Sequence, residues 1–106
     1  MTWHTVCPAA RIPSERGVCV LVDGRQVALF RTVSGGLHAL SNQDPVSGAM
    51  VLSRGIVGTR GDRDVVMSPM YKQAFDLATG ECLDLPGVSV AVLPVRVHGG
   101  FVAVDV

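Results

Sequence analysis

Short apolar runs separated by turn residues dominate the sequence. The clearest pair is Val18–Val22 and Arg25–Thr32, which flank the dipeptide Asp23-Gly24. Two residues of this kind between apolar runs favour a type I′ β-hairpin, because that turn needs positive φ at both central positions. We therefore predict a hairpin over residues 18–32.

Further apolar runs predict more strands of similar length. A second hairpin is expected where Leu93–His98 and Phe101–Val106 flank Gly99-Gly100, and four other runs are expected to be strands: Leu37–Ser41, Gly55–Arg60, Asp64–Ser68 and Ala74–Leu77. Pro8–Arg16 favours a short helix or irregular loop, and Ser41–Arg54 favours a loop because it contains Pro45 and Gly48. No long window shows the apolar spacing of an amphipathic helix. About nine or ten short strands are typical of an all-β sandwich or open barrel.

Composition agrees with one globular all-β domain. The chain has 106 residues, of which 48% are hydrophobic and 17% are charged, so we expect a single domain spanning 1–106. Nineteen valines against one lysine favour strands over helices. The formal net charge is zero, which argues against a nucleic-acid partner, since such proteins need a basic surface.

The first residues do not resemble a secretion signal. The opening Met1–Thr5 lacks both the basic start and the apolar run of a signal peptide. No apolar stretch approaches the ~20 residues that a membrane helix needs. We expect a cytoplasmic protein with no membrane partner.

The three cysteines form no recognisable metal or redox motif. Cys7, Cys19 and Cys82 are widely spaced and contain no Cys-x-x-Cys pair. We expect three buried, reduced thiols that pack as small hydrophobic side chains. A Cys19–Cys82 disulfide is the alternative.

Two segments carry the candidate chemistry, Ala39–Ala49 and Val65–Gly80. Both resemble the cluster-binding loops of the Rieske ferredoxin family. Those loops read Asn-x-Cys-Pro-His-x-Gly or Asn-x-Cys-x-His-x-Gly, and later Cys-Pro-x-His followed by Phe-Asp-x-x-Thr-Gly. The matching framework residues here are Asn42, Pro45, Gly48, Pro69, Phe75, Asp76, Thr79 and Gly80. The resemblance implies a Rieske-like fold with a former cluster-binding subdomain at about residues 42–80.

All four ligand positions differ from the Rieske pattern. A Rieske centre is held by two Cys and two His, and the matching positions here are Asp44, Val46, Ser68 and Tyr71. Val46 has no donor atom, and the other three offer only oxygen, whereas such iron sites favour thiolate and imidazole. We therefore expect no iron–sulfur cluster, no other metal, no bound cofactor and no catalytic residue in this chain.

One branch of the family departs from the pattern in the same way. Three segments of this chain carry the likeness: Asp44–Gly48, Leu52–Gly58 and Ser68–Gln73. They resemble segments of the small subunits of bacterial assimilatory NAD(P)H-dependent nitrite reductases. The resemblance implies an oxidoreductase subunit whose partner is the large subunit. That partner would carry sirohaem, an iron–sulfur cluster, FAD and the NAD(P)H site, and would reduce nitrite to ammonium in nitrate assimilation.

The vacated loops are the expected docking site for that large subunit. The candidate partner-binding residues are Pro45, Val46, Pro69, Met70, Tyr71 and Lys72. Tyr71 has two possible roles, either as a docking side chain or as a plug that fills the space of the missing cluster. Likewise Val46, Met50 and Met70 could form an exposed apolar patch or fill the core. Asp44 is expected to cap a turn, since Asp before Pro commonly bonds nearby amides.

Two other functions are compatible with the sequence. One is an electron carrier with unusual ligands, serving another oxidoreductase, which the absence of a donor at Val46 argues against. The other is a free-standing Rieske-like protein-interaction module that acts with a different reductase or oxygenase. Iron analysis and copurification would discriminate among the three.

Overall fold

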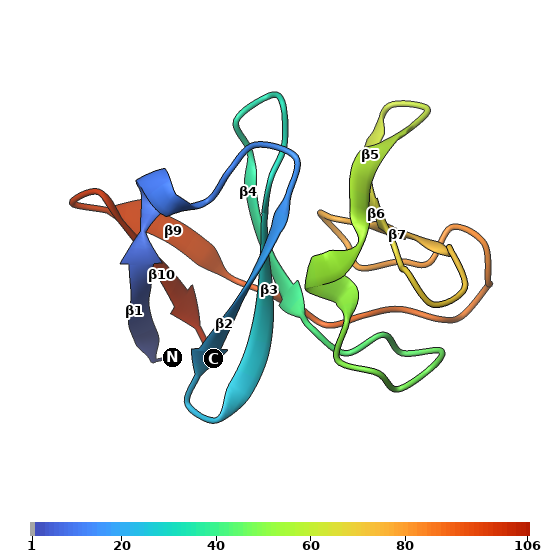
Figure 1. The fold of residues 1–106 in the computed structure, drawn as a ribbon, viewed down its shortest axis with the longest axis horizontal. Coiled ribbons are helices and arrows are strands. Elements are labelled where there is room, and N and C mark those ends of the chain that lie inside the picture. The colour runs from blue at the N-terminus through green and yellow to red at the C-terminus, as the bar shows by residue number, and fades with distance from the viewer. Residues whose placement is uncertain (1) are drawn as a thin grey trace.

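Ten strands form three antiparallel sheets in the computed structural model, which describes residues 2–106 (Figure 1). The strands are β1 (Trp3–Pro8), β2 (Gly17–Val22), β3 (Arg25–Arg31), β4 (Leu37–Ser41), β5 (Ile56–Arg60), β6 (Arg63–Met67), β7 (Ala74–Asp76), β8 (Val92–Leu93), β9 (Val95–His98) and β10 (Phe101–Asp105). Two short 3-10 turns, η1 (Ala9–Arg11) and η2 (Leu52–Arg54), lie within segments expected to be irregular. The predicted all-β fold is confirmed.

The hairpin predicted around Asp23-Gly24 is present. β2 pairs with β3 so that Val22 lies opposite Arg25, and φ is 49° at Asp23 and 78° at Gly24. Both central residues therefore have the positive φ that a type I′ turn requires.

The stretch Leu93–His98 is not the single strand that its alternating pattern predicted. Residues 92–93 form β8 and pair with β4, whereas residues 95–98 form β9 and pair with β10. Pro94 lies between them, and a proline has no N–H to donate within a ladder. The chain therefore crosses from one sheet to another at this residue.

The sequence pattern did not predict β1, because the Trp3–Pro8 run has no clear turn signal of its own. It pairs with the far end of the chain, with Trp3 opposite Asp105. The guanidinium of Arg96 in β9 lies 4.0 Å from the centre of the Trp3 ring, a cation–π contact across the sheet. This pairing brings both chain ends to one side of the molecule (Figure 1).

β3 lies at the centre of the core, and four consecutive residues on it are buried. Ala28 and Phe30 belong to a cluster that includes Phe75 of β7. Val27 and Leu29 belong to a second cluster, which includes buried valines of β10. Because successive side chains of a strand point to opposite faces, β3 joins the central sheet to both outer sheets.

The three cysteines are free thiols. Cys82 is buried and Cys7 is half-buried, but Cys19 is exposed. The expectation of three buried thiols is therefore wrong for Cys19. Its strand, β2, lies at the edge of the central sheet, so part of its surface has no neighbouring strand. Among residues 2–106, no helix has the length and apolar content needed to cross a bilayer.

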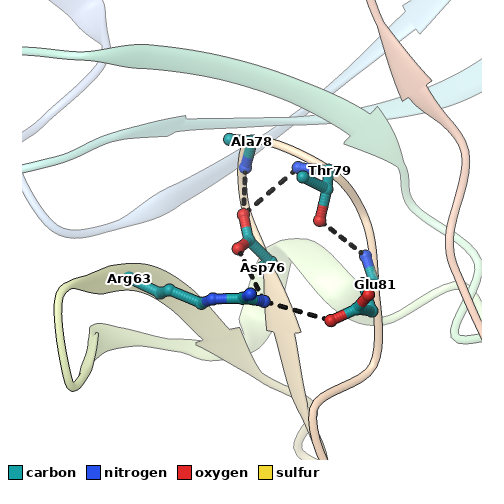
Figure 2. A network of polar contacts seen from close by, with 5 residues as sticks. All are labelled: Arg63, Asp76, Ala78, Thr79 and Glu81. Atoms are coloured by element: carbon teal, nitrogen blue, oxygen red, sulfur yellow. Dashed lines mark hydrogen bonds and ion pairs between the residues drawn. The ribbon is translucent and has the colours of Figure 1, made fainter. Parts of the chain in front are cut away.

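A compact loop follows β7 and explains the Phe-Asp-x-x-Thr-Gly motif (Figure 2). One carboxylate oxygen of Asp76 accepts the N–H groups of Ala78 and Thr79 at 2.7 and 3.2 Å. The other lies 3.4 Å from the Arg63 guanidinium, which also contacts Glu81 at 3.0 Å. The Asp76 N–H donates to the Glu81 carbonyl at 2.8 Å, so the loop is closed by its own backbone.

Gly80 allows this loop to pack closely against the backbone of Val90. Its φ is +79°, and its N–H donates to the Asp76 carbonyl at 2.7 Å. A Cβ at this position would lie 2.0 Å from the Val90 carbonyl oxygen. Any side chain here therefore requires both a strained backbone and displacement of residue 90.

We expect Gly80→Ala to lower the free energy of unfolding by at least about 3 kcal/mol, combining left-handed strain with a backbone clash. Gly87→Ala is the matched control, because Gly87 has φ +81° but open space around its Cβ position. The free energy of unfolding of that variant should fall by only about 1 kcal/mol. Urea denaturation of both variants measures the difference, and equal losses would contradict the packing argument.

Candidate functional site

The first candidate loop is organised by Asp44. The Oδ1 atom of Asp44 accepts the N–H of Val46 at 2.7 Å and that of Ser47 at 3.3 Å. The Asp44 carbonyl accepts the Gly48 N–H, and the Asp44 N–H donates to the Ala49 carbonyl, both at 2.8 Å. The prediction that Asp44 caps a turn is confirmed.

The second candidate loop is built in the same way around Ser68. Its Oγ accepts the Met70 N–H at 3.2 Å. Its carbonyl accepts the Lys72 N–H at 2.9 Å, and its N–H donates to the Gln73 carbonyl at 3.0 Å.

The loop at Asp76 is a third copy of this arrangement (Figure 2). In each copy the first side chain accepts the third N–H, the first carbonyl accepts the fifth N–H, and the fifth residue has positive φ. The three loops are 44–49, 68–73 and 76–81.

A side-chain hydrogen bond joins the first two loops. The Ser68 hydroxyl donates to Oδ2 of Asp44, and both residues are buried, with exposures of 1% and 0%. Because Asp44 and Ser68 occupy the two positions of the Rieske cysteines, this bond connects the loops where the resemblance implies that a cluster would.

The Asp44 carboxylate is stabilised in its ionised form. Burial raises the pKa of Asp44, but hydrogen bonds from Ser68, Val46 and Ser47 outweigh it and hold the pKa below its ordinary value. A hydrogen bond to a charged acceptor is stronger than one between neutral groups. The link between the loops is therefore charge-assisted.

Asn42 fixes the first loop to the central sheet. Its buried side chain donates to Oε1 of Gln26 at 3.0 Å and to the Met50 carbonyl at 3.1 Å. Its Oδ1 accepts the Ser53 N–H at 2.7 Å. Sequence reasoning identified Asn42 as a framework residue but missed Gln26, because an exposed-looking Gln after a turn carries no local signal for this role.

The side chains at the two histidine positions are exposed. Val46 is 38% exposed and Tyr71 is 59% exposed, so the Tyr71 side chain is not a buried plug between the loops. Met50 and Met70 are also exposed and do not fill the core. All six residues expected to bind a partner are exposed, and we call them the tip surface: Pro45, Val46, Pro69, Met70, Tyr71 and Lys72.

The residues present do not fit an iron–sulfur cluster. Val46 offers no donor, and the oxygens of Asp44 and Ser68 already bond to each other and to backbone amides. Nowhere in residues 2–106 do three or more His, Cys, Asp or Glu residues gather closely enough to hold a metal ion.

Comparison with known proteins places these observations in a family context. The model of the Rieske-like [2Fe-2S] domain matches residues 2–105. The nitrite reductase (NADH) small subunit of Salmonella typhimurium is 40% identical over 101 residues, or 94% of each chain. A crystal structure from Mycobacterium tuberculosis, of a protein assigned as an NADH-dependent nitrite reductase small subunit, has a TM-score of 0.93 and 54% identity, covering 97% of this chain and 93% of that one.

A larger relative contains the same module. The NAD(P)H nitrite reductase large subunit of Klebsiella oxytoca is 39% identical over 98 residues. The match covers 92% of this chain and 10% of that protein, so this chain spans only a small part of the Klebsiella sequence.

We expect Ser68→Ala to lower the free energy of unfolding by about 1.5–3 kcal/mol, since it removes a hydrogen bond to a buried charged group. Ser34→Ala is the control, because Ser34 itself is exposed and its hydroxyl bonds to the neutral hydroxyl of Thr32. Its expected cost is below about 0.5 kcal/mol. Equal values for the two variants in urea denaturation would contradict a stabilising link between the loops.

Protonation of Asp44 should also lower the stability of the fold in acid. Because the folded-state pKa lies below the ordinary value of 3.8, the unfolded chain takes up the proton first. The stabilisation is complete above that value and is lost as pH falls from it through the folded-state pKa.

Asp44→Asn should reduce the loss of stability as pH falls. Part of that loss should remain in the variant, because Asp84 also has a lowered pKa. The Ala74 N–H and then Arg60 lower the pKa of Asp84. Thermal unfolding between about pH 2 and 6 measures both proteins, and identical slopes would show that Asp44 does not contribute.

Proposed function

This chain belongs to the Rieske-like [2Fe-2S] domain family, and we propose that it is the small subunit of an NAD(P)H-dependent nitrite reductase. In this role it has no active site of its own and docks to the large subunit that reduces nitrite to ammonium. The observation that carries the proposal is the match to a nitrite reductase small subunit over 94% of both chains.

The Klebsiella relative supports the choice of partner. In that protein a segment similar to nearly all of this chain is part of the large subunit itself. Joining two modules in one chain keeps each at a high effective concentration near the other. We infer that the module in this chain functions beside the same kind of large subunit.

We further propose that this subunit works without an iron–sulfur cluster. Rieske irons require thiolate and imidazole ligands, and the four corresponding side chains are Asp44, Val46, Ser68 and Tyr71. The carboxylate and hydroxyl at the cysteine positions are mutually satisfied. Sirohaem, iron–sulfur cluster, FAD and NAD(P)H are assigned in this proposal to the large subunit.

The tip surface is the docking region that we propose. Aromatic and methionine side chains are enriched in interface cores, and here Met70 is 46% and Tyr71 59% exposed.

The chain ends lie together, since the Val106 N–H donates to the Thr2 carbonyl at 3.3 Å. They lie on the opposite side of the molecule from β5 and β6, the strands that precede the second loop (Figure 1). A connection through either end would therefore leave the tip surface free.

The test is copurification of the tagged chain with the large subunit from cells growing on nitrite. We expect the native chain to retain a large partner with sirohaem absorption, and the double variant Met70→Asp/Tyr71→Ala to retain at most about a tenth as much. Both substitutions replace exposed side chains, so thermal stability should change little.

Val33→Asp is the control, because Val33 is 76% exposed and lies in the turn after β3. It should assemble normally. Normal assembly of the double variant would refute docking through the tip surface, while a native chain that never captures the large subunit would refute the subunit assignment. Stoichiometric iron and sulfide in anaerobically purified chain would refute the cluster-free proposal.

A further inference from the structure

Lys72 has a backbone conformation that is unfavourable for its side chain. Its φ is 61°, in the left-handed region where a residue with a Cβ atom is strained by roughly 1 kcal/mol or more. It is also the only lysine of the chain. Strain of this kind often accompanies a functional requirement for the side chain.

The other copies of the loop show what this position accepts. Lys72 is the fifth residue of its loop, and the fifth residues of the other two are Gly48 and Gly80, with φ of 80° and 79°. A glycine at position 72 could make the same backbone hydrogen bond to Ser68 without strain. The lysine is therefore not needed to form the loop.

Lys72 also supplies the exposed charge of the two loops. Within residues 42–50 and 68–73 the charged side chains are Asp44 and Lys72. Asp44 is completely buried and bonded to Ser68, whereas Lys72 is exposed. The tip surface thus presents one positive charge beside the apolar side chains of Val46, Met70 and Tyr71.

From these observations we infer that the Lys72 ammonium pairs with a carboxylate on the large subunit, next to an apolar pocket that receives Met70 and Tyr71. The inference rests on the proposed function, because it names the chemistry of that same docking site. A single exposed cation with apolar neighbours is complemented by one acidic group within an apolar surface. Such a pair orients the partner and accelerates its association.

The test compares folding and assembly in the same variants. Lys72→Gly removes both the strain and the charge, so the melting temperature of the isolated chain should rise by roughly 3 °C. Its affinity for the purified large subunit should fall at least about threefold at low salt. Lys72→Gln should show the same loss of affinity with unchanged stability, and Lys72→Arg should remain near the native affinity.

Glu15→Gly is the matched control, because Glu15 is another exposed charged residue with φ of 60° but lies outside the three loops. It should gain stability and assemble normally. The affinity of the native chain should decrease with added salt more steeply than that of Lys72→Gln, because salt screens exposed charges.

Each of the following results would refute a different part of the inference. Native affinity in Lys72→Gly and Lys72→Gln would refute the ion pair but leave the subunit assignment intact. A lower melting temperature for Lys72→Gly would refute the strain argument. Failure of the native chain to bind the large subunit at any salt concentration would refute the proposed function together with this inference.

Discussion

The hydrogen bond from Ser68 to the Asp44 carboxylate holds together two loops that no β-ladder connects. Each loop is closed by its own backbone bonds, but only this bond between buried side chains links one loop to the other at their first residues. Burial strengthens a satisfied hydrogen bond and makes an unsatisfied one costly. Together with the Asn42 anchor and the shared core of Leu52 and Phe75, this contact sets the relative position of the exposed residues that follow, from Pro45 and Pro69 onward.

The recurrence of one loop design explains how such different side chains fit a common frame. The first position needs an oxygen that can accept the third N–H, a condition that Asp44, Ser68 and Asp76 all meet. In the third copy the acidic side chain contacts Arg63 instead of another loop (Figure 2). The backbone pattern is therefore shared, and the chemistry of the first side chain decides what each loop binds.

The exposure of the tip surface connects this frame with assembly. Apolar side chains such as Met70 and Tyr71 gain little while they face water, and their burial by a partner would contribute free energy to binding. Their loops are closed by internal hydrogen bonds, and we expect such a closed loop to lose little conformational entropy on docking. This combination is consistent with the proposed role as a subunit.

The sequence by itself determined the all-β fold, the β2–β3 hairpin, the capping role of Asp44 and the replacement of every Rieske ligand position. These features depend on residue identity, on the period of two along strands and on local turn chemistry. Only the tertiary structure decided that Pro94 divides a strand between two sheets, that β1 pairs with β10, and that Asp44 meets Ser68. Each of these depends on partners far apart in the chain, and a local pattern does not specify which distant segment will lie beside it.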